Sequence, residues 1–187
     1  MGVVGITKER YYALLGILAP IVAAVFIITA IIMSPWFNWS SNALSDLGHS
    51  VESNVAPFFN IGLLLCGFLT IIYSLTIFRS YAKYTSYFLV FAGLALQLVA
   101  TFDEVYGAFH FQVSVLFFIS LGFASVSYFI EKRSIIAVAA FVVGSISWML
   151  FGLKIYSTGI AVPEAISSIA VASWVVMSAL RLYSNNQ

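Results

Sequence analysis

Six long apolar segments are the feature of this sequence that most restricts its fold. Each is long enough to cross a hydrocarbon core of roughly 30 Å, which takes about 20 helical residues. Backbone groups in lipid must pair within their own segment, and these uninterrupted runs lack the alternation that a β-barrel requires. We therefore predict an all-α protein, a polytopic six-transmembrane-helix bundle with spans at about 11–33, 57–78, 84–102, 109–130, 134–153 and 163–182.

The composition agrees with a membrane protein and excludes other classes. Hydrophobic residues make up 62% and charged residues 8% of the 187 residues, far from the proportions of a soluble domain. A net charge of +1 with scattered Lys and Arg offers no basic patch, so we expect no nucleic acid among the partners. The only cysteine, Cys66, excludes an internal disulfide and a cysteine metal cluster. With no internal repeat or linker, we expect one transmembrane domain over 1–187.

The basic residues predict which ends of the helices face the cytoplasm, because Lys and Arg are enriched in cytoplasmic loops. If six helices alternate, seven of the eight basic residues fall on one side and only Lys154 on the other. Five of the seven acids fall on the side opposite the basic residues. We therefore expect an integral cell-membrane protein with both termini in the cytoplasm and an acidic outer face. The short inner connections predict that the spans they join are antiparallel neighbours.

Residues 34–57 form the longest polar interruption between the spans. Two tryptophans and a phenylalanine at its start indicate an aromatic belt at the headgroup level. A serine cap followed by Gly48 in a left-handed turn predicts a short surface helix, with Leu44 and Leu47 facing the membrane. Within it Asp46 lies three residues before His49, close enough in sequence to hold one tautomer of the imidazole.

The loop between the third and fourth spans carries a second group of titratable residues. Asp103 and Glu104 end one span and His110 begins the next, across a turn that Gly107 would ease. A histidine near a helix N-terminus feels the positive end of the helix dipole, which disfavours an added proton. A neutral imidazole, able to act as a base or bind a metal, is therefore expected at His110.

Three interpretations explain these outer residues, and the sequence leaves them open. In the first, the acidic, aromatic-rimmed face binds a lipid headgroup, a partner membrane subunit or a second copy of this chain. Its ligand-binding or structural positions are Asn42, Gly48, His49, Asn60, Asp103 and Glu104.

In the second interpretation, the protein is a membrane-embedded lipid hydrolase. His110 would be the base, Asp46 its orienting group and Ser45 the nucleophile, although no G-x-S-x-G elbow surrounds that serine. Two histidines and a carboxylate can also hold catalytic zinc, which would make His49, His110 and Asp46 metal ligands, without a recognised metal-binding spacing.

In the third interpretation, the same polar residues only cap turns and close the bundle. A transporter or channel is the least favoured function, because the spans carry few charges and show no repeat or broken-helix pattern.

Asn38 begins an Asn-Trp-Ser acceptor sequence for N-glycosylation on the predicted outer side. It lies directly after the first span, where the lipid headgroups would hinder modification. We therefore expect little glycosylation of Asn38, and only in a host that carries out this modification.

One stretch resembles a known family. The run Asn42-Ala43-Leu44-Ser45-Asp46-Leu47-Gly48, together with Phe59-Asn60 at the second span and acids before His110, is similar to the membrane family called domain of unknown function 998. The likeness extends over nearly the whole chain as a six-helix pattern. It implies this topology and brings no established activity. A more distant similarity to Frag1/DRAM/Sfk1 proteins, which share S-D-x-G after the first helix, implies lipid handling. The resemblance to domain of unknown function 998 implies that Asn42, Ser45, Asp46, Gly48, Asn60 and His110 are the positions shared with that family.

Overall fold

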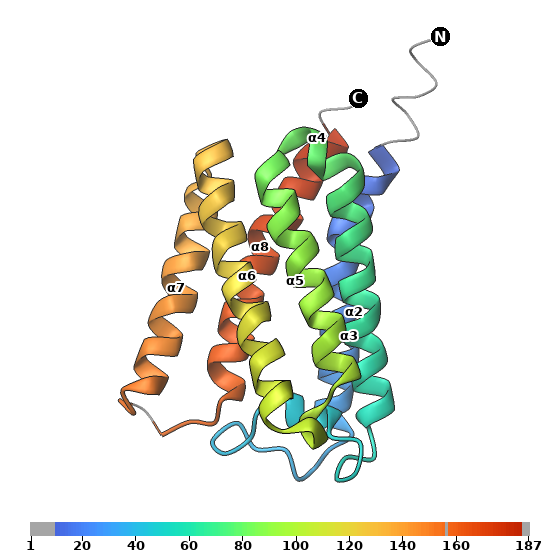
Figure 1. Cartoon of the computed structure of the whole chain (residues 1–187), viewed down its shortest axis with the longest axis vertical. Coiled ribbons are helices and arrows are strands. Elements are labelled where there is room, and N and C mark those ends of the chain that lie inside the picture. The colour runs from blue at the N-terminus through green and yellow to red at the C-terminus, as the bar shows by residue number, and fades with distance from the viewer. Residues whose placement is uncertain (1–9, 156, 185–187) are drawn as a thin grey trace.

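The computed structural model describes residues 10–155 and 157–184, and the regular secondary structure in this part of the chain is helical, without a strand (Figure 1). Six of its helices are long and apolar enough to cross a membrane, which confirms the predicted six-helix bundle. Lys8 and Glu9, which were counted in predicting the orientation, lie outside the described residues. The long helices are α2 (Ala13–Ile32), α3 (Ala56–Tyr73), α5 (Lys83–Thr101), α6 (Ala108–Lys132), α7 (Ile135–Gly152) and α8 (Ala161–Ser184).

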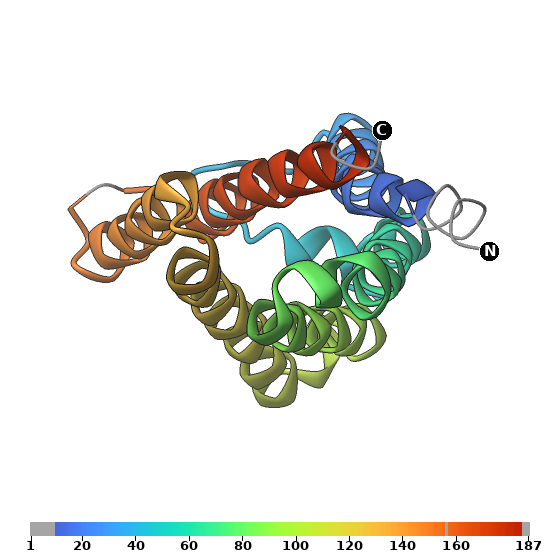
Figure 2. The same ribbon diagram turned by 90° about the horizontal axis from the view of Figure 1, so that it is seen from above.

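The six helices form a ring in chain order (Figure 2). Each packs against the next, and α8 packs back against α2. The predicted neighbours α3 with α5 and α6 with α7 are in contact. Because the helices alternate in direction, α2 begins and α8 ends at the same end of the bundle (Figure 1).

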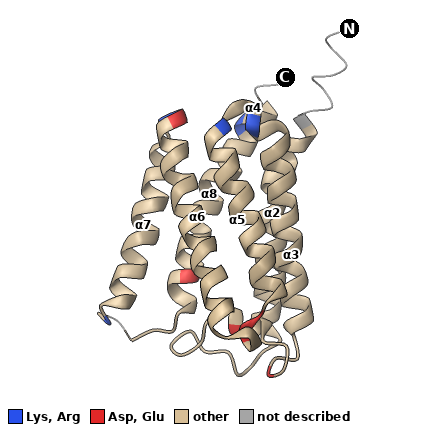
Figure 3. Cartoon of the chain, viewed as in Figure 1, with Lys and Arg blue, Asp and Glu red and all other residues tan. Residues whose placement is uncertain are grey.

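Charge separates the two ends of this ring (Figure 3). We call one the basic end, because it carries most of the described Arg and Lys residues together with one acid, Glu131, and the other the acidic end. The basic end holds Arg79, Lys83, Lys132, Arg133 and Arg181, and the acidic end holds Asp46, Glu52, Asp103, Glu104 and Glu164 together with one basic residue, Lys154.

The second span is longer and less regular than predicted. α3 continues into a π-helical turn, η3 (Ser74–Phe78), and a last helical turn, α4 (Arg79–Tyr81). Thr76 leaves the helical backbone conformation, at φ −91° and ψ −107°, and its hydroxyl donates to the carbonyl oxygen of Ile72 at 2.6 Å. A threonine hydroxyl that bonds back to the preceding turn commonly bends a helix, which accounts for the kink here.

Aromatic side chains fill the half of the ring nearest the basic end. Tyr128 stacks on Trp174 at a centroid distance of 4.7 Å and lies 5.8 Å from the ring of Phe78. The Tyr73 hydroxyl lies 2.9 Å from the Ser178 hydroxyl. All of these side chains are buried, so they form a packed aromatic core.

The 34–55 loop covers the ring at the acidic end (Figure 1). Leu44 and Leu47 are buried, as predicted, but the surface helix shrinks to one 3₁₀ turn, η2 (Ser45–Gly48). Gly48 is not left-handed, which corrects the prediction: a Cβ there would lie 2.5 Å from the Asn60 side-chain oxygen. The Asn60 amide also donates to the Gly48 carbonyl at 2.9 Å. Glycine is therefore needed at this position for close approach.

Candidate functional site

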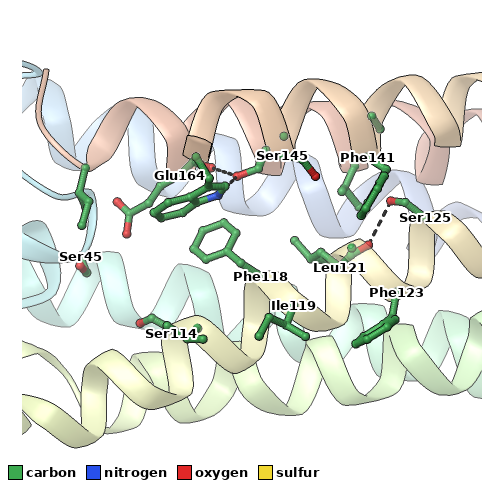
Figure 4. Close-up of a pocket in the computed structure, with 18 of the residues that line it drawn as sticks. Ser45, Ser114, Phe118, Ile119, Leu121, Phe123, Ser125, Phe141, Ser145 and Glu164 are labelled. Carbon is green, nitrogen blue, oxygen red and sulfur yellow. Dashed lines mark hydrogen bonds between the residues drawn. The ribbon is translucent and has the colours of Figure 1, made fainter. Parts of the chain in front are cut away.

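A cavity of about 740 Å³ lies between α6, α7 and α8 and extends to the acidic end (Figure 4). On α6 its lining runs from His110 to Val126, roughly 24 Å at 1.5 Å per residue. This volume lies within the range of about 300–1,000 Å³ that is typical of small-molecule sites. The wall beyond the acidic end is mostly apolar and includes Phe118, Ile119, Leu121, Phe123, Phe141 and Trp148.

One side of the cavity is open along the bundle. Phe111, Ile119 and Phe123 line the cavity, yet 64%, 51% and 56% of their surfaces are exposed. All three belong to α6, which is long and apolar enough to span a membrane. The opening therefore runs along a helix that is long and apolar enough to span a membrane.

Polar side chains gather where the cavity meets the acidic end, and we call them the polar cluster. It consists of Ser45 from η2, Glu104 from the 3₁₀ turn η4 (Glu104–Tyr106), His110 and Ser114 from the first turns of α6, and Glu164 from the first turn of α8. The Ser45 hydroxyl donates to Oε1 of Glu104 at 2.5 Å, and Nε2 of His110 lies 3.3 Å from the same oxygen. The Glu104 carboxylate thus joins the 34–55 loop, 59 residues away in the sequence, to the nearby start of α6.

The hydrogen bonds of His110 determine which of its ring nitrogens carries a proton. Nδ1 lies 2.8 Å from the Phe102 carbonyl oxygen, which can only accept, so Nδ1 donates. Nε2 faces both the Glu104 carboxylate and the Ser114 hydroxyl, which lies 3.4 Å away. The charged ring can donate from Nε2 to Glu104, whereas the neutral ring can accept there from Ser114. The neutral imidazole expected from the helix dipole is thus one of two available states.

Glu104 is the member of the cluster most clearly biased toward its charged form. Its hydrogen bond with His110 lowers the pKa of the carboxyl group below the usual value, and the Ser45 hydroxyl lowers it further, against a partial burial that raises it. The adjacent Asp103 has a structural role instead: it is buried and accepts the Val105 backbone N–H at 2.9 Å, capping η4.

The turn between η4 and α6 has the form that the sequence predicts. Gly107 adopts a positive φ of 52°, a conformation in which glycine is favoured. This turn brings Glu104 back over the first turn of α6 and so places it against His110.

Glu164 is a site residue that the sequence indicates only as one of the outer acids. Its side chain is buried, with Oε2 accepting the Leu44 backbone N–H at 2.7 Å. Oε1 has no hydrogen-bond partner among the described residues, and Figure 4 shows the carboxylate directed into the cavity. The available signal was an acid in the first turn of an otherwise apolar span, a position that commonly marks function in membrane proteins.

Asp46 does not orient His110, in contrast to the hydrolase hypothesis. Its Oδ2 accepts from the Asn42 amide at 2.7 Å and from the Ala43 backbone N–H at 3.0 Å, and within the described chain it makes no hydrogen bond to His110. Orientation of the imidazole falls instead to the Phe102 carbonyl and to Glu104. Asp46 and Asn42 therefore shape the 34–55 loop.

The three residues considered as zinc ligands, His49, His110 and Asp46, do not come together. Across residues 10–155 and 157–184, no group of three or more His, Cys, Asp or Glu side chains is placed to hold a metal ion. Nδ1 of His49 instead accepts the Glu52 backbone N–H at 3.1 Å. Both loop residues are thus engaged in local turns, and the donor set does not fit zinc.

Comparison with known proteins supports the resemblance noted in the sequence. No curated protein and no solved structure matches the chain significantly. A family described as "Protein of unknown function (DUF998)" matches residues 17–181, which include the 34–55 loop, the polar cluster and nearly all of the six spans. The chain therefore belongs to the DUF998 family of proteins of unknown function.

Proposed function

We propose that this protein binds a membrane amphiphile, with the apolar tail in the cavity and the polar headgroup at the polar cluster. The observation that carries the proposal is that the apolar cavity and the polar cluster are continuous. One cavity joins an apolar, laterally open wall to a buried polar end. A ligand that enters at the depth of the lipid tails and meets polar groups only at one end has the character of a lipid.

The contrast with the packed aromatic core supports an occupant of the cavity. The side chains that line an unfilled apolar space lose the dispersion contacts that they would make with an occupant. The aromatic core around Trp174 leaves no comparable space, whereas the wall around Phe118 and Phe141 faces about 740 Å³. A lipid tail would restore those contacts.

A second part of the proposal concerns orientation. The positive-inside tendency places the basic end in the cytoplasm, so that the polar cluster faces outward and both termini lie inside. Single cysteines in a Cys66→Ala background, at Ser50 for the acidic end and at Ser184 for the basic end, test it. An impermeant maleimide on intact cells should label only the cysteine at position 50. Labelling of position 184 alone would mean that the orientation is the opposite of the one proposed.

The binding proposal can be tested by filling the cavity. Gly122 lines it, and a Cβ there would lie 3.6 Å from the Phe141 ring, an ordinary contact. Gly122→Leu should therefore project into the cavity without disturbing the backbone. Gly152→Leu is the matched control, because a Cβ at that glycine meets nothing within 4 Å.

The readout is photo-crosslinking with a lipid that carries a diazirine in its tail, followed by peptide mapping. Peptides of α6 and α7 should be labelled in the wild type and in Gly152→Leu, and only weakly in Gly122→Leu. Equal labelling of all three proteins would mean that the tail contacts the outer surface and not the cavity.

Lipid hydrolysis is a second candidate, favoured by one geometric observation. Ser114 lies 3.4 Å from Nε2 of His110, whose Nδ1 is held by a carbonyl, so a neutral ring could take the proton of a serine nucleophile. Ser45, the nucleophile suggested by the sequence, donates to Glu104 instead. A fluorophosphonate probe that labels wild type and Ser45→Ala but not Ser114→Ala would support this function. Absence of labelling in the wild type would count against it.

A partner membrane subunit or a homo-oligomer stays a prediction. The apolar surfaces of α7 are those that any helix facing lipid presents, and they do not by themselves favour a protein partner. Cross-linking of the purified protein in bilayer discs would reveal a stable oligomer.

A further inference from the structure

We propose that the headgroup bound at the polar cluster is an ammonium cation, held between the carboxylates of Glu104 and Glu164. The inference rests on the proposed binding of an amphiphile and specifies its chemical class. It follows from three features of the cavity: its charges, its unused hydrogen-bond acceptors and the position of its polar end.

The charges that line the cavity favour a cation. The lining contains two carboxylates and one imidazole and no Lys or Arg. With His110 protonated and both Glu104 and Glu164 ionised, one negative charge is in excess. Charge interactions are strong at a site shielded from water. An excess negative charge there therefore favours a cationic headgroup. A headgroup that carries only a carboxylate would meet a single cation, and His110 is already paired with Glu104.

The unused acceptors match the donors of an ammonium group. Oε1 of Glu164 and Oε2 of Glu104 have no hydrogen-bond partner among the described residues, although both residues line the same end of the cavity. Only 9% of the surface of Glu164 is exposed, and a carboxylate so enclosed is costly unless it is paired with a cation. A primary ammonium has three N–H donors and no acceptor, which suits a site where acceptors are left over.

The position of these carboxylates suits a headgroup. His110 and Glu164 stand in the first turns of α6 and α8 at the acidic end, with Trp36 and Trp39 exposed at the same end. Exposed tryptophans at the end of a span commonly lie at the level of the lipid headgroups. A cation at that level would direct its tail down the apolar wall of the cavity.

A matched series of amphiphiles tests the inference on the full chain in discs of zwitterionic lipid. Dodecylamine, dodecyltrimethylammonium, dodecanol and dodecanoic acid share a tail and differ in headgroup charge and in N–H donors. Affinity is measured by displacement of the photo-crosslinking lipid, with empty discs correcting for partition into the bilayer. Dodecylamine should bind at least about ten-fold more tightly than dodecanol, as expected for a charge-assisted hydrogen bond, and dodecanoic acid should bind most weakly.

Two variants locate the effect. Glu164→Gln keeps an oxygen that can accept the Leu44 N–H but loses the charge, so it should lose the preference for dodecylamine while binding dodecanol as the wild type does. Glu104→Gln should reduce the preference as well. Glu52→Gln is the control, because Glu52 is an exposed acid at the same end that does not line the cavity.

The outcomes separate this inference from the proposed function. Equal binding of dodecylamine and dodecanol to the wild type would overturn the cationic headgroup and leave amphiphile binding intact. Failure of all four to displace the lipid, together with an unlabelled cavity, would overturn amphiphile binding itself. Equal losses in Glu52→Gln and Glu164→Gln would assign the preference to surface charge and so overturn the site. The wild-type series remains decisive if Glu164→Gln does not fold.

Discussion

Glu131 and Glu164 are both acids at the ends of membrane-spanning helices, but their surroundings are opposite. Glu131 accepts three hydrogen bonds from the start of α5: the backbone N–H groups of Tyr84 at 3.0 Å and Thr85 at 2.8 Å, and the Thr85 hydroxyl at 2.5 Å. Glu164 accepts one and faces a cavity. The first acid satisfies the open N–H groups of a helix N-terminus, while the second keeps an oxygen free. The comparison teaches that an acid at a helix end is not by itself a sign of binding. What distinguishes Glu164 from Glu131 is a carboxylate oxygen that faces a cavity and has no hydrogen-bond partner in the described part of the chain.

A second contrast distinguishes two parts of the bundle. α6 takes part in both, and its Tyr128 is stacked in the aromatic core while its Phe118 faces open space. The packed cores, one around Trp174 and one around Phe59, can hold the helices together while the space between α6, α7 and α8 stays hollow. Stability should therefore depend mainly on the packed cores, and binding on the hollow space.

The largest expected effect concerns the packed core. Trp174→Ala removes a fully buried ring that stacks on Tyr128 and donates to the Ser125 hydroxyl at 3.0 Å, and should lower the free energy of unfolding by about 3–5 kcal/mol. Phe111→Ala, on the open wall of the cavity, should cost less than about 1 kcal/mol. Unfolding by sodium dodecyl sulfate in mixed micelles measures both. Similar costs would contradict the division between the packed aromatic core and the hollow space between α6, α7 and α8.

Gly48→Ala should show that the loop over the cavity is itself tightly packed. The added Cβ would lie 2.5 Å from the Asn60 side-chain oxygen and 3.0 Å from the Phe59 ring, and overpacking of this kind costs about 1–3 kcal/mol. Thermal denaturation measures the loss. Gly152→Ala, in open space at the end of α7, should change stability by no more than about 0.5 kcal/mol. A neutral Gly48→Ala would mean that this loop yields readily.

The two acids should respond differently to the same substitution. Glu131→Gln weakens the acceptor for the first turn of α5 and should cost about 1–2 kcal/mol, as the loss of a helix cap does. Glu164→Gln should be neutral or slightly stabilising, because it removes an enclosed charge that lacks a full set of partners. Chemical denaturation of both variants in the absence of added amphiphile tests the pair. The reverse order of costs would break the comparison on which the binding site rests.

The smallest expected effect is a pH dependence of the polar cluster. His110 lowers the pKa of Glu104 in the folded protein, so between the folded value and the unfolded value of about 4.3 the unfolded state binds more protons. The stabilisation by Glu104 is thus fully present above that unfolded value and is lost as the pH falls through the folded one. The stability difference between wild type and Glu104→Gln should shrink on acidification from pH 7. A difference that does not change with pH would exclude the ion pair as its source.

Much of the fold could be predicted because lipid restricts it so strongly. Every predicted span ends within about three residues of the helix observed, since a segment of fixed length must satisfy its own backbone groups. The kink at Thr76 could not be predicted in the same way, because a threonine within an apolar run has no distinct periodicity.

The site was only partly predictable. Glu104 and His110 could be named because the Gly107 turn brings them together locally. Asp46 and His49 were assigned chemistry, but their hydrogen bonds are made within their own loop. Ser114 lies one helical turn after His110, a spacing that indicates a contact between the two side chains.

The sequence by itself determined that this is a membrane protein, how many long helices it has and how charge is separated between its ends. Each of these follows from local apolar length and from the positions of charged residues. Only the tertiary structure decided that α6, α7 and α8 leave a cavity and that Glu164 faces it, because a contact such as that between Leu44 and Glu164 joins residues 120 positions apart. A linear pattern records where an acid lies along the chain, but the number of its hydrogen-bond partners depends on which distant segments pack around it.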